Sequence, residues 1–384
     1  MQTSLINRVA VLKSTDWSFP NESSRGDITD LHPYPARFIP PIPESIINAF
    51  SSKKLNILDP FAGCGTTLRA GLNAGHNVYG IDVNGLAGLL QRVYSQHFSE
   101  LDLVHFKARS EELVFKLKKS GNSTNRKFLS IPNLDHWFNK DAQDILSTSI
   151  SLINKYSGTN HISDLLKFSI SRVIVKVSNQ KSDTQYVAIE KGLDRSQIVK
   201  IISNSLDFVY KRFFENREPE LWKGLSSVIQ GDARDKNTYS NISDIDLIIT
   251  SPPYPNAYEY WLYHKYRMFW LGLDPLWSRE REIGARPFYS GTGKKNEFDF
   301  QNDLVSIFQN LHEITKPNAL QFWVVGDSVI KGRLIDNTKI VENACDLTGW
   351  KVIEKMQRIV DRKRSSFQGI GRLGIEHILV VQKL

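Results

Sequence analysis

A serine, two prolines and a tyrosine directly follow a short apolar run in the second half of the chain. Ser251-Pro252-Pro253-Tyr254 comes after residues 246–250, whose β-branched and apolar side chains predict a buried strand. Because neither proline can donate to a strand ladder, the backbone must leave the sheet after Thr250. The hydroxyl of Ser251 and the carbonyl of Pro252 could accept hydrogen bonds from an exocyclic NH2 group, and Tyr254 could stack on the ring that carries it. The alternative is a structural turn in which Tyr254 only packs.

A second stretch combines a strand, a glycine turn and a helix start. Residues 55–67 read Leu-Asn-Ile-Leu-Asp-Pro-Phe-Ala-Gly-Cys-Gly-Thr-Thr, and a helix is expected from Thr66 to Asn73. Gly63 and Gly65 let the backbone approach a ligand closely, and the free N–H groups of the helix point into the same space. Asp82 ends the next strand about 20 residues later, where a βαβ unit places an acid that holds ribose hydroxyls. The full Gly-x-Gly-x-x-Gly spacing of dinucleotide-binding proteins is absent.

Both stretches resemble motifs of one enzyme family, the amino-group DNA methyltransferases. Residues 250–254 look like the catalytic motif of that family, and residues 59–67 look like its S-adenosylmethionine loop. The Ser form of the catalytic motif resembles the branch that methylates the exocyclic N4 of cytosine. The Asp form is more typical of adenine-N6 enzymes, which remain the alternative, followed by RNA guanine-N2 methyltransferases and by protein-glutamine methyltransferases.

The resemblance implies roles for particular residues of this chain. Ser251, Pro252, Pro253 and Tyr254 would form the catalytic turn, acting on a base flipped out of double-stranded DNA. Asp232, in a Gly-Asp turn after the third strand, would accept from the cofactor's adenine amino group, unless it only makes local hydrogen bonds. The residues expected to contact S-adenosylmethionine are Arg37, Phe38, Asp59, Phe61, Gly63, Gly65, Thr66, Asp82, Asp232 and Ala233.

The charge balance favours a polyanionic partner. The 384 residues carry 49 Lys plus Arg against 41 Asp plus Glu, a formal net charge of +8. Two clusters of basic residues could bind DNA phosphates or could simply be solvated; one lies in a loop after the catalytic turn and one near the carboxyl terminus. Their members are Arg279, Arg281, Lys294, Lys295, Arg362, Lys363 and Arg364.

The order of elements predicts an α/β fold with a Rossmann-like mixed sheet of the S-adenosylmethionine-dependent type. Residues 1–98 are expected to hold a loosely attached start, a proline-rich segment that is not helical up to about Pro43, and the cofactor-binding half. Residues 223–384 would form the catalytic half and end in an antiparallel hairpin. Between them, residues 99–222 show helical spacing and predict a large helical insertion. This insertion either covers the sheet or takes part in target recognition.

Other features exclude several classes of protein. Two distant cysteines, Cys64 and Cys345, make a zinc site or a disulfide framework unexpected, and neither stands in a catalytic turn of the kind used for cytosine C5 chemistry. No run is apolar enough to span a membrane, so we expect a cytoplasmic enzyme without a membrane partner. The family resemblance adds a companion restriction endonuclease as a further expected partner, whereas the oligomeric state is not indicated.

Overall fold

The computed structural model describes residues 2–19, 27–120, 131–156, 160–183, 185–217, 222–256, 258–360 and 374–384. Arg362, Lys363 and Arg364, which the sequence suggests as DNA contacts, lie outside these ranges. None of the helices within these ranges is long and apolar enough to cross a bilayer.

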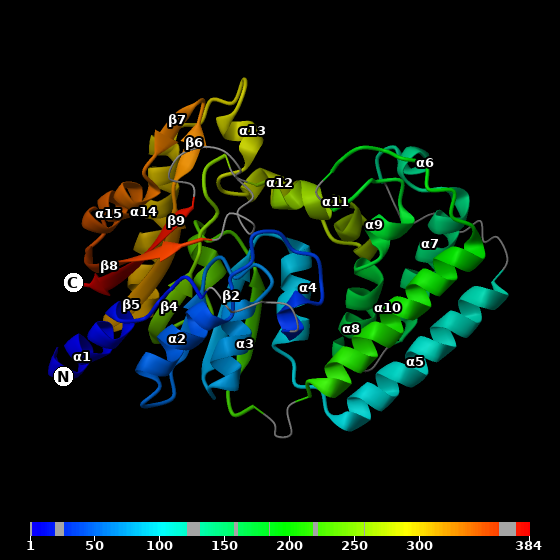
Figure 1. Ribbon diagram of the computed structural model, residues 1–384, viewed down its shortest axis with the longest axis horizontal. Helices are drawn as coiled ribbons and strands as arrows, with labels where there is room; N and C mark the ends of the chain where they lie inside the picture. Colours follow the sequence, from blue (N-terminus) through cyan, green and yellow to red (C-terminus); the bar gives the residue numbers. More distant parts are fainter. Residues whose placement is uncertain are drawn as a thin grey trace.

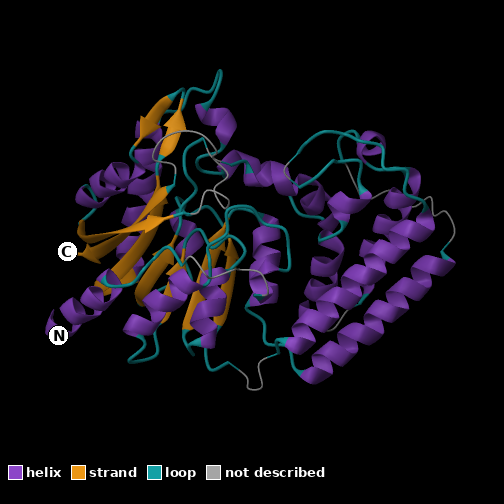
Figure 2. Ribbon diagram, viewed as in Figure 1, coloured by secondary structure: helices purple, strands orange, loops and turns teal. Residues whose placement is uncertain are grey.

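A seven-stranded sheet organises the fold, and its strands lie in the order β3-β2-β1-β4-β5-β9-β8. Neighbours from β3 to β5 pair in parallel, whereas β9 runs antiparallel to both β5 and β8. Figure 2 shows the strands in orange among the helices. The strands are β1 (Asn56–Asp59), β2 (Asn77–Asp82), β3 (Ser226–Gln230), β4 (Ile245–Thr250), β5 (Thr315–Gly326), β8 (Trp350–Ile359) and β9 (Ile375–Lys383). The predicted mixed α/β sheet with a closing hairpin is therefore confirmed.

Helices cover both faces of this sheet, because its central strands bury side chains on both sides. One face packs its core against α1 (Gln2–Lys13), α2 (Pro41–Phe50) and α3 (Thr66–Asn73). The other packs against α14 (Glu297–Ile314) and α15 (Asn337–Asp346). In β4, Ile248 faces the second core while Leu247 and Ile249 face the first, as the alternation of a strand requires.

Two expectations for the amino-terminal region were wrong. The start of the chain is not loosely attached, since Leu12 and Trp17 are buried in the first core and the carbonyl of Trp17 accepts from Arg358 Nε at 3.1 Å. Helix α2 begins at Pro41 rather than after Pro43. Prolines are tolerated there because the N–H groups of a first helical turn have no intrahelical acceptor.

The residues between β2 and β3 form helices with their own core, shown to the right of the sheet in Figure 1. They follow α4 (Gly85–Tyr94), which packs against both the sheet and the insertion. These helices are α5 (Glu100–Lys119), α6 (Leu134–Trp137), α7 (Lys140–Lys155), α8 (Asn160–Ser171), α9 (Ile174–Val177) and α10 (Arg195–Glu215). The predicted helical insertion is therefore present.

Helix α11 (Tyr260–Leu271), from the carboxyl-terminal part of the chain, packs against helices of the insertion. Tyr266, Met268 and Trp270 are buried in the insertion's core, so this side of the helix serves packing. Arg267 is buried, pairs with Asp183 and donates from Nε to the carbonyl of Ser171 at 3.0 Å. A buried charge with these partners fixes the orientation of α11 against α8.

The chain after α11 continues through smaller elements on either side of β5. They include α12 (Pro275–Arg281), α13 (Arg286–Tyr289) and a small hairpin of β6 (Ser328–Ile330) and β7 (Arg333–Ile335). Two single turns of 3-10 helix, η1 (Ile28–Asp30) and η2 (Lys236–Tyr239), complete the regular elements of the described ranges.

Candidate active site

A pocket opens where the parallel strands β1, β2, β3 and β4 end. The carboxyl edge of an open α/β sheet is the usual place for a ligand, because the loops that leave neighbouring strands converge there. The predicted site residues that line it are Arg37, Phe38, Asp59, Phe61, Gly63, Thr66, Asp82, Asp232, Ala233, Ser251, Pro253 and Arg281. The glycine turn and the catalytic turn therefore face one cavity.

The glycine turn uses its two glycines differently. Gly63 lines the pocket at φ 51°, and a Cβ added there would lie 3.5 Å from the ring of Tyr34. Gly65, at φ 95°, lies outside the pocket wall, and a Cβ there would come within 3.1 Å of the Gln91 Cα. Both need the left-handed backbone that glycine adopts without strain. Gly65 thus permits α3 to begin close to α4, whereas Gly63 shapes the cavity.

Asp59 connects the glycine turn to the end of β4. Its carboxylate accepts from the hydroxyl of Thr67 at 2.7 Å, the hydroxyl of Thr250 at 2.6 Å and the backbone N–H of Phe61 at 3.0 Å. Burial raises the pKa of Asp59 to about 6, and these three hydrogen bonds oppose that rise. One acid therefore holds the start of α3 and the end of β4 in a fixed relation.

Asp82 stabilises the other side of the glycine turn. Its carboxylate accepts from the backbone N–H of Gly63 at 2.9 Å and that of Asn84 at 2.8 Å. Burial raises the pKa of Asp82 to about 6 despite these two donors. Because a carboxylate oxygen can accept more than one hydrogen bond, Asp82 can still receive ligand hydroxyls while it orders the turn.

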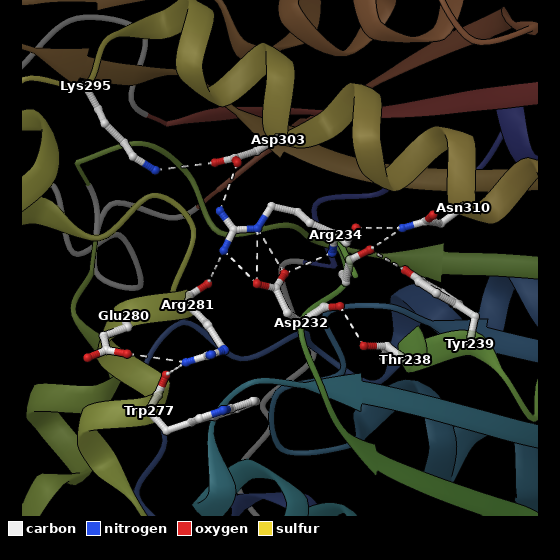
Figure 3. Close-up of polar contacts among 11 residues, drawn as sticks. Asp232, Arg234, Thr238, Tyr239, Trp277, Glu280, Arg281, Lys295, Asp303 and Asn310 are labelled. Atoms are coloured by element: carbon white, nitrogen blue, oxygen red, sulfur yellow. Dashed lines mark hydrogen bonds and ion pairs between the residues drawn. The ribbon is translucent and has the colours of Figure 1, made fainter. Parts of the chain in front are cut away.

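Asp232 lines the pocket but already has a strong internal partner (Figure 3). The Arg234 guanidinium bonds both carboxylate oxygens, with Nη2 2.7 Å from Oδ2 and Nε 3.0 Å from Oδ1. Arg234 also bonds Asp303 at 2.9 Å and the carbonyl of Arg281 at 3.0 Å. The Gly-Asp turn is thereby tied to α14 and α12, and a contact of Asp232 with adenine stays a prediction.

The catalytic turn divides its residues between the pocket and the sheet. Ser251 and Pro253 line the cavity, whereas Pro252 and Tyr254 do not. The hydroxyl of Tyr254 donates to the carbonyl of Val324 at 3.2 Å, and the ring packs on Gly326, where a Cβ would lie 3.3 Å from it. A stacking role for Tyr254 against a base stays a prediction.

The basic residues downstream of the catalytic turn are distributed over different surroundings. Arg281 lines the pocket and lies over the Trp277 ring, 4.7 Å from its centroid, while Arg279 lies 5.3 Å from the centroid of Trp261. Lys295 is paired with Asp303 at 3.8 Å, and Lys294 is exposed. Their contribution to DNA binding stays a prediction.

Several residues that line the pocket were not indicated by the sequence motifs. The ring of Tyr34 stacks with the rings of Tyr260 and His264, whose centroids lie 5.8 and 4.9 Å away. Glu282 ends the charged run Arg279-Glu280-Arg281-Glu282, which reads as a solvated helix end, yet it is buried in the pocket wall. No local signal in the sequence distinguishes it from its exposed neighbour Glu280.

The described ranges contain no group of three or more His, Cys, Asp or Glu side chains arranged to hold a metal ion. The acids of the pocket bond backbone N–H groups, hydroxyls or Arg234 instead. The arrangement suits an organic ligand with hydroxyl and positively charged groups.

The sheet order and the closing hairpin give the Rossmann-like fold of the S-adenosylmethionine-dependent methyltransferase type, with a shared pocket at the carboxyl ends of the strands. The sequence model described as DNA methylase matches residues 7–85, which include the glycine turn and Asp82. This match agrees with the resemblance to the amino-group DNA methyltransferases, a family whose cofactor is S-adenosylmethionine.

Relatives with assigned names agree with this family. The Type II methyltransferase M.MvaI of Kocuria varians is 22% identical, and the match covers 82% of this chain and 80% of that protein. The Type II methyltransferase M.BsoBI of Geobacillus stearothermophilus is 22% identical over 64% of this chain and 53% of that protein.

Among solved structures, TrmN from Thermus thermophilus aligns over 94% of this chain and 53% of its own, with 10% identity and a TM-score of 0.37. This chain therefore spans about half the length of M.BsoBI and of the TrmN chain.

The pocket residues fit the cofactor of this family. A backbone free of a Cβ at Gly63 leaves room for close approach, and the carboxylates of Asp82 and Glu282 suit hydroxyls and a cationic ligand. When bound, S-adenosylmethionine supplies an electrophilic methyl group on a positively charged sulfur.

Substitution of Asp82 tests this side of the pocket. We expect Asp82→Ala to weaken S-adenosylmethionine binding at least tenfold, about 1.4 kcal/mol, because it removes an acceptor for ligand hydroxyls and the acceptor that orders Gly63. Calorimetric titration measures the change, and Asp346→Ala, at the end of α15 and outside the pocket, is the control. An unchanged dissociation constant would remove Asp82 from the cofactor site.

Proposed function

We propose that this protein transfers a methyl group from S-adenosylmethionine to the exocyclic N4 of cytosine in a specific site of double-stranded DNA. The observation that supports the proposal most is that Ser251 and Gly63 line the same pocket. A donor held by the glycine turn and an acceptor held by the catalytic turn would then meet without a large movement of the chain. Ser251, rather than Asp, at this position favours cytosine over adenine.

The chain's own residues would act by positioning. The lone pair of an exocyclic amine is delocalised into its ring, so the amine is a weak nucleophile until its geometry becomes tetrahedral. The hydroxyl of Ser251, which lines the cavity, would hold an amine hydrogen and direct the lone pair toward the methyl group, and the carbonyl of Pro252 is the second acceptor that the sequence predicts. When bound, S-adenosylmethionine would supply the methyl carbon and retain the electron pair of the broken sulfur–carbon bond on sulfur, while the catalytic turn would hold the amine, whose proton would pass to water.

The target base must leave the duplex to reach Ser251, which is half-buried. The rigid backbone of Pro252 and Pro253 would keep the serine acceptor fixed while the base enters. Paired bases present their exocyclic amines within the stack, so base flipping follows from the depth of the site. A companion restriction endonuclease, expected from the sequence, stays a prediction.

A methyl-transfer assay tests the base and the catalytic turn together. With methyl-labelled S-adenosylmethionine and mixed-sequence duplex DNA, we expect label in N4-methylcytosine after digestion to nucleosides. Ser251→Ala should lower turnover on the order of 10²-fold, as loss of one positioned polar group does elsewhere, while cofactor affinity stays within about twofold.

Ser306→Ala, on α14 away from the pocket, serves as the matched control and should keep full turnover. Label found only in N6-methyladenine would contradict the choice of cytosine. Full activity of Ser251→Ala would remove the serine from the mechanism.

We further propose that residues 99–222 form a target-recognition region between the cofactor-binding half, 1–98, and the catalytic half, 223–384. The proposal is supported by the packing of the insertion on α4 and α11, whose amino-terminal ends adjoin the pocket. Tyr260 begins α11 and lines the cavity, and Asn84 caps α4 and lines it too.

Hydrogen exchange tests this division. On addition of duplex DNA that carries the target site, we expect exchange to slow in helices of the insertion, with less slowing on DNA of scrambled sequence. Equal exchange in residues 99–222 with both DNAs would contradict a role in recognition, because a sequence-reading surface must distinguish them.

A further inference from the structure

Glu282 is a buried carboxyl group in the wall of the pocket for which the proposed reaction has no role. It follows α12 directly, and only 6% of the residue is exposed. Its two oxygens accept from the backbone N–H of Tyr260 at 2.6 Å and of Trp261 at 3.1 Å. These are two of the N–H groups that the first turn of α11 leaves without intrahelical acceptors.

Hydrogen bonds hold the segment that carries Glu282 on both sides of the cavity. The carbonyl of Arg281 accepts from Arg234 Nη2 at 3.0 Å, next to the Gly-Asp turn. On the other side, the carbonyl of Gly284 accepts from the N–H of Asn256 at 2.9 Å, two residues past the catalytic turn. A carboxyl group on such a segment keeps its place when a ligand enters, which is the condition for charge selectivity.

The charged groups around Glu282 do not neutralise it. Within the described ranges, no lysine or arginine forms an ion pair with its carboxylate. The acids that act on it are Asp82, at the end of β2, and Glu259, just before α11. The tyrosines that face it are Tyr34, Tyr260 and Tyr263.

Two arginines beside this segment are engaged elsewhere. The guanidinium of Arg281 lies over the Trp277 ring and donates to the backbone carbonyl of Trp277 at 3.4 Å (Figure 3). Arg234 is paired with Asp232 and Asp303. The wall around Glu282 therefore has an excess of acidic groups, which a cationic ligand would complement.

The protonation of Glu282 follows from this environment. Burial raises its pKa to about 8, and the charge of Asp82 adds to the rise, while the two backbone N–H donors oppose it. At neutral pH the carboxyl group of the free protein is mainly protonated. A positive charge brought into the cavity favours the ionised form, so binding of a cation should release a proton from Glu282.

We propose that Glu282 is a charge-selective residue of the cofactor pocket, which favours the cationic sulfonium donor over its neutral thioether product, S-adenosylhomocysteine. This inference rests on the proposed placement of S-adenosylmethionine in the pocket. After transfer the sulfur carries no charge, Glu282 takes a proton back from water, and the electrostatic preference for keeping the ligand is lost. The carboxyl group of Glu282 would thus favour both binding of the donor and release of the product.

Calorimetric titration of the whole chain with each ligand at pH 6.5 and 8.5 tests the proposal. In the wild type, the affinity for S-adenosylmethionine relative to S-adenosylhomocysteine should rise at least threefold with pH, because Glu282 ionises in this window and Asp82, with a pKa of about 6, is largely ionised already. Glu282→Gln should weaken donor binding about tenfold, leave product binding within about twofold and make the ratio independent of pH.

Two further variants separate charge from structure. Glu282→Asp keeps the charge and should keep the rise of the ratio with pH. Glu280→Gln removes a charge two residues away that is exposed and outside the pocket wall, so it should behave as the wild type. Equal weakening of both ligands in Glu282→Gln would overturn the proposal, because the carboxyl group would then contact a part that donor and product share.

The wild type alone supplies an independent measurement. Titrations at pH 7 in buffers of different ionisation enthalpy should show more protons released on binding of donor than of product. Equal release would overturn the charge-selective role even if Glu282→Gln failed to fold. If neither ligand binds the wild type, or if Asp82→Ala leaves both affinities unchanged, the placement of the cofactor fails instead.

Discussion

The carboxylate of Asp59 is the interaction on which the pocket depends. It accepts hydrogen bonds from Thr67, at the start of α3, and from Thr250, at the end of β4, two residues 183 positions apart in the chain. Both hydroxyls are buried, so loss of the acceptor would leave two donors unsatisfied, at a cost of about 1–3 kcal/mol each. The burial of Asp59 and its three donors fix the glycine turn and the catalytic turn relative to each other.

The remaining walls are fastened in a similar way, by charged groups that bond the backbone. Asp82 holds Gly63, Arg234 holds the carbonyl of Arg281, and Glu282 holds the first turn of α11. Each of these contacts joins segments that are distant in sequence, and each places a charged group beside the cavity. The same residues can therefore serve both folding and ligand binding, which explains why a pocket built mainly from loops keeps a defined shape.

The sequence was sufficient to predict the sheet, the hairpin and the helical insertion. The periodicity of apolar residues indicates local structure, and glycine and proline residues mark where helices and strands end. It also predicted which two turns meet, since the carboxyl ends of parallel strands lie at one edge of the sheet. Thr66 begins α3 and Asp82 ends β2, as those patterns indicate. Local patterns are informative wherever the neighbours that matter are close in the chain.

The failures arise where distant segments decide the outcome. Trp17 is held by Arg358, so the amino-terminal region is ordered by a strand more than three hundred residues away. Glu282 reads as part of a solvated helix end, yet it is buried and accepts from two N–H groups of α11, which lies about 20 residues earlier in the chain. The engagement of Asp232 by Arg234 is local, yet its extension to Asp303 and Arg281 depends on the packing of α14 and α12.

The coupling of Thr67 and Thr250 through Asp59 is the most direct measure of this account. Thr250 lies outside the pocket wall. If only residues that line the pocket determined ligand affinity, loss of the Thr250 hydroxyl would leave that affinity unchanged. We predict that Thr250→Val weakens S-adenosylmethionine binding several-fold, that Thr250→Ser does not, and that the double variant Thr67→Val/Thr250→Val departs from additivity by about 0.5 kcal/mol or more. Unchanged affinity in Thr250→Val, with strictly additive effects in the double variant, would contradict the claim that one carboxylate holds the two turns as a single site.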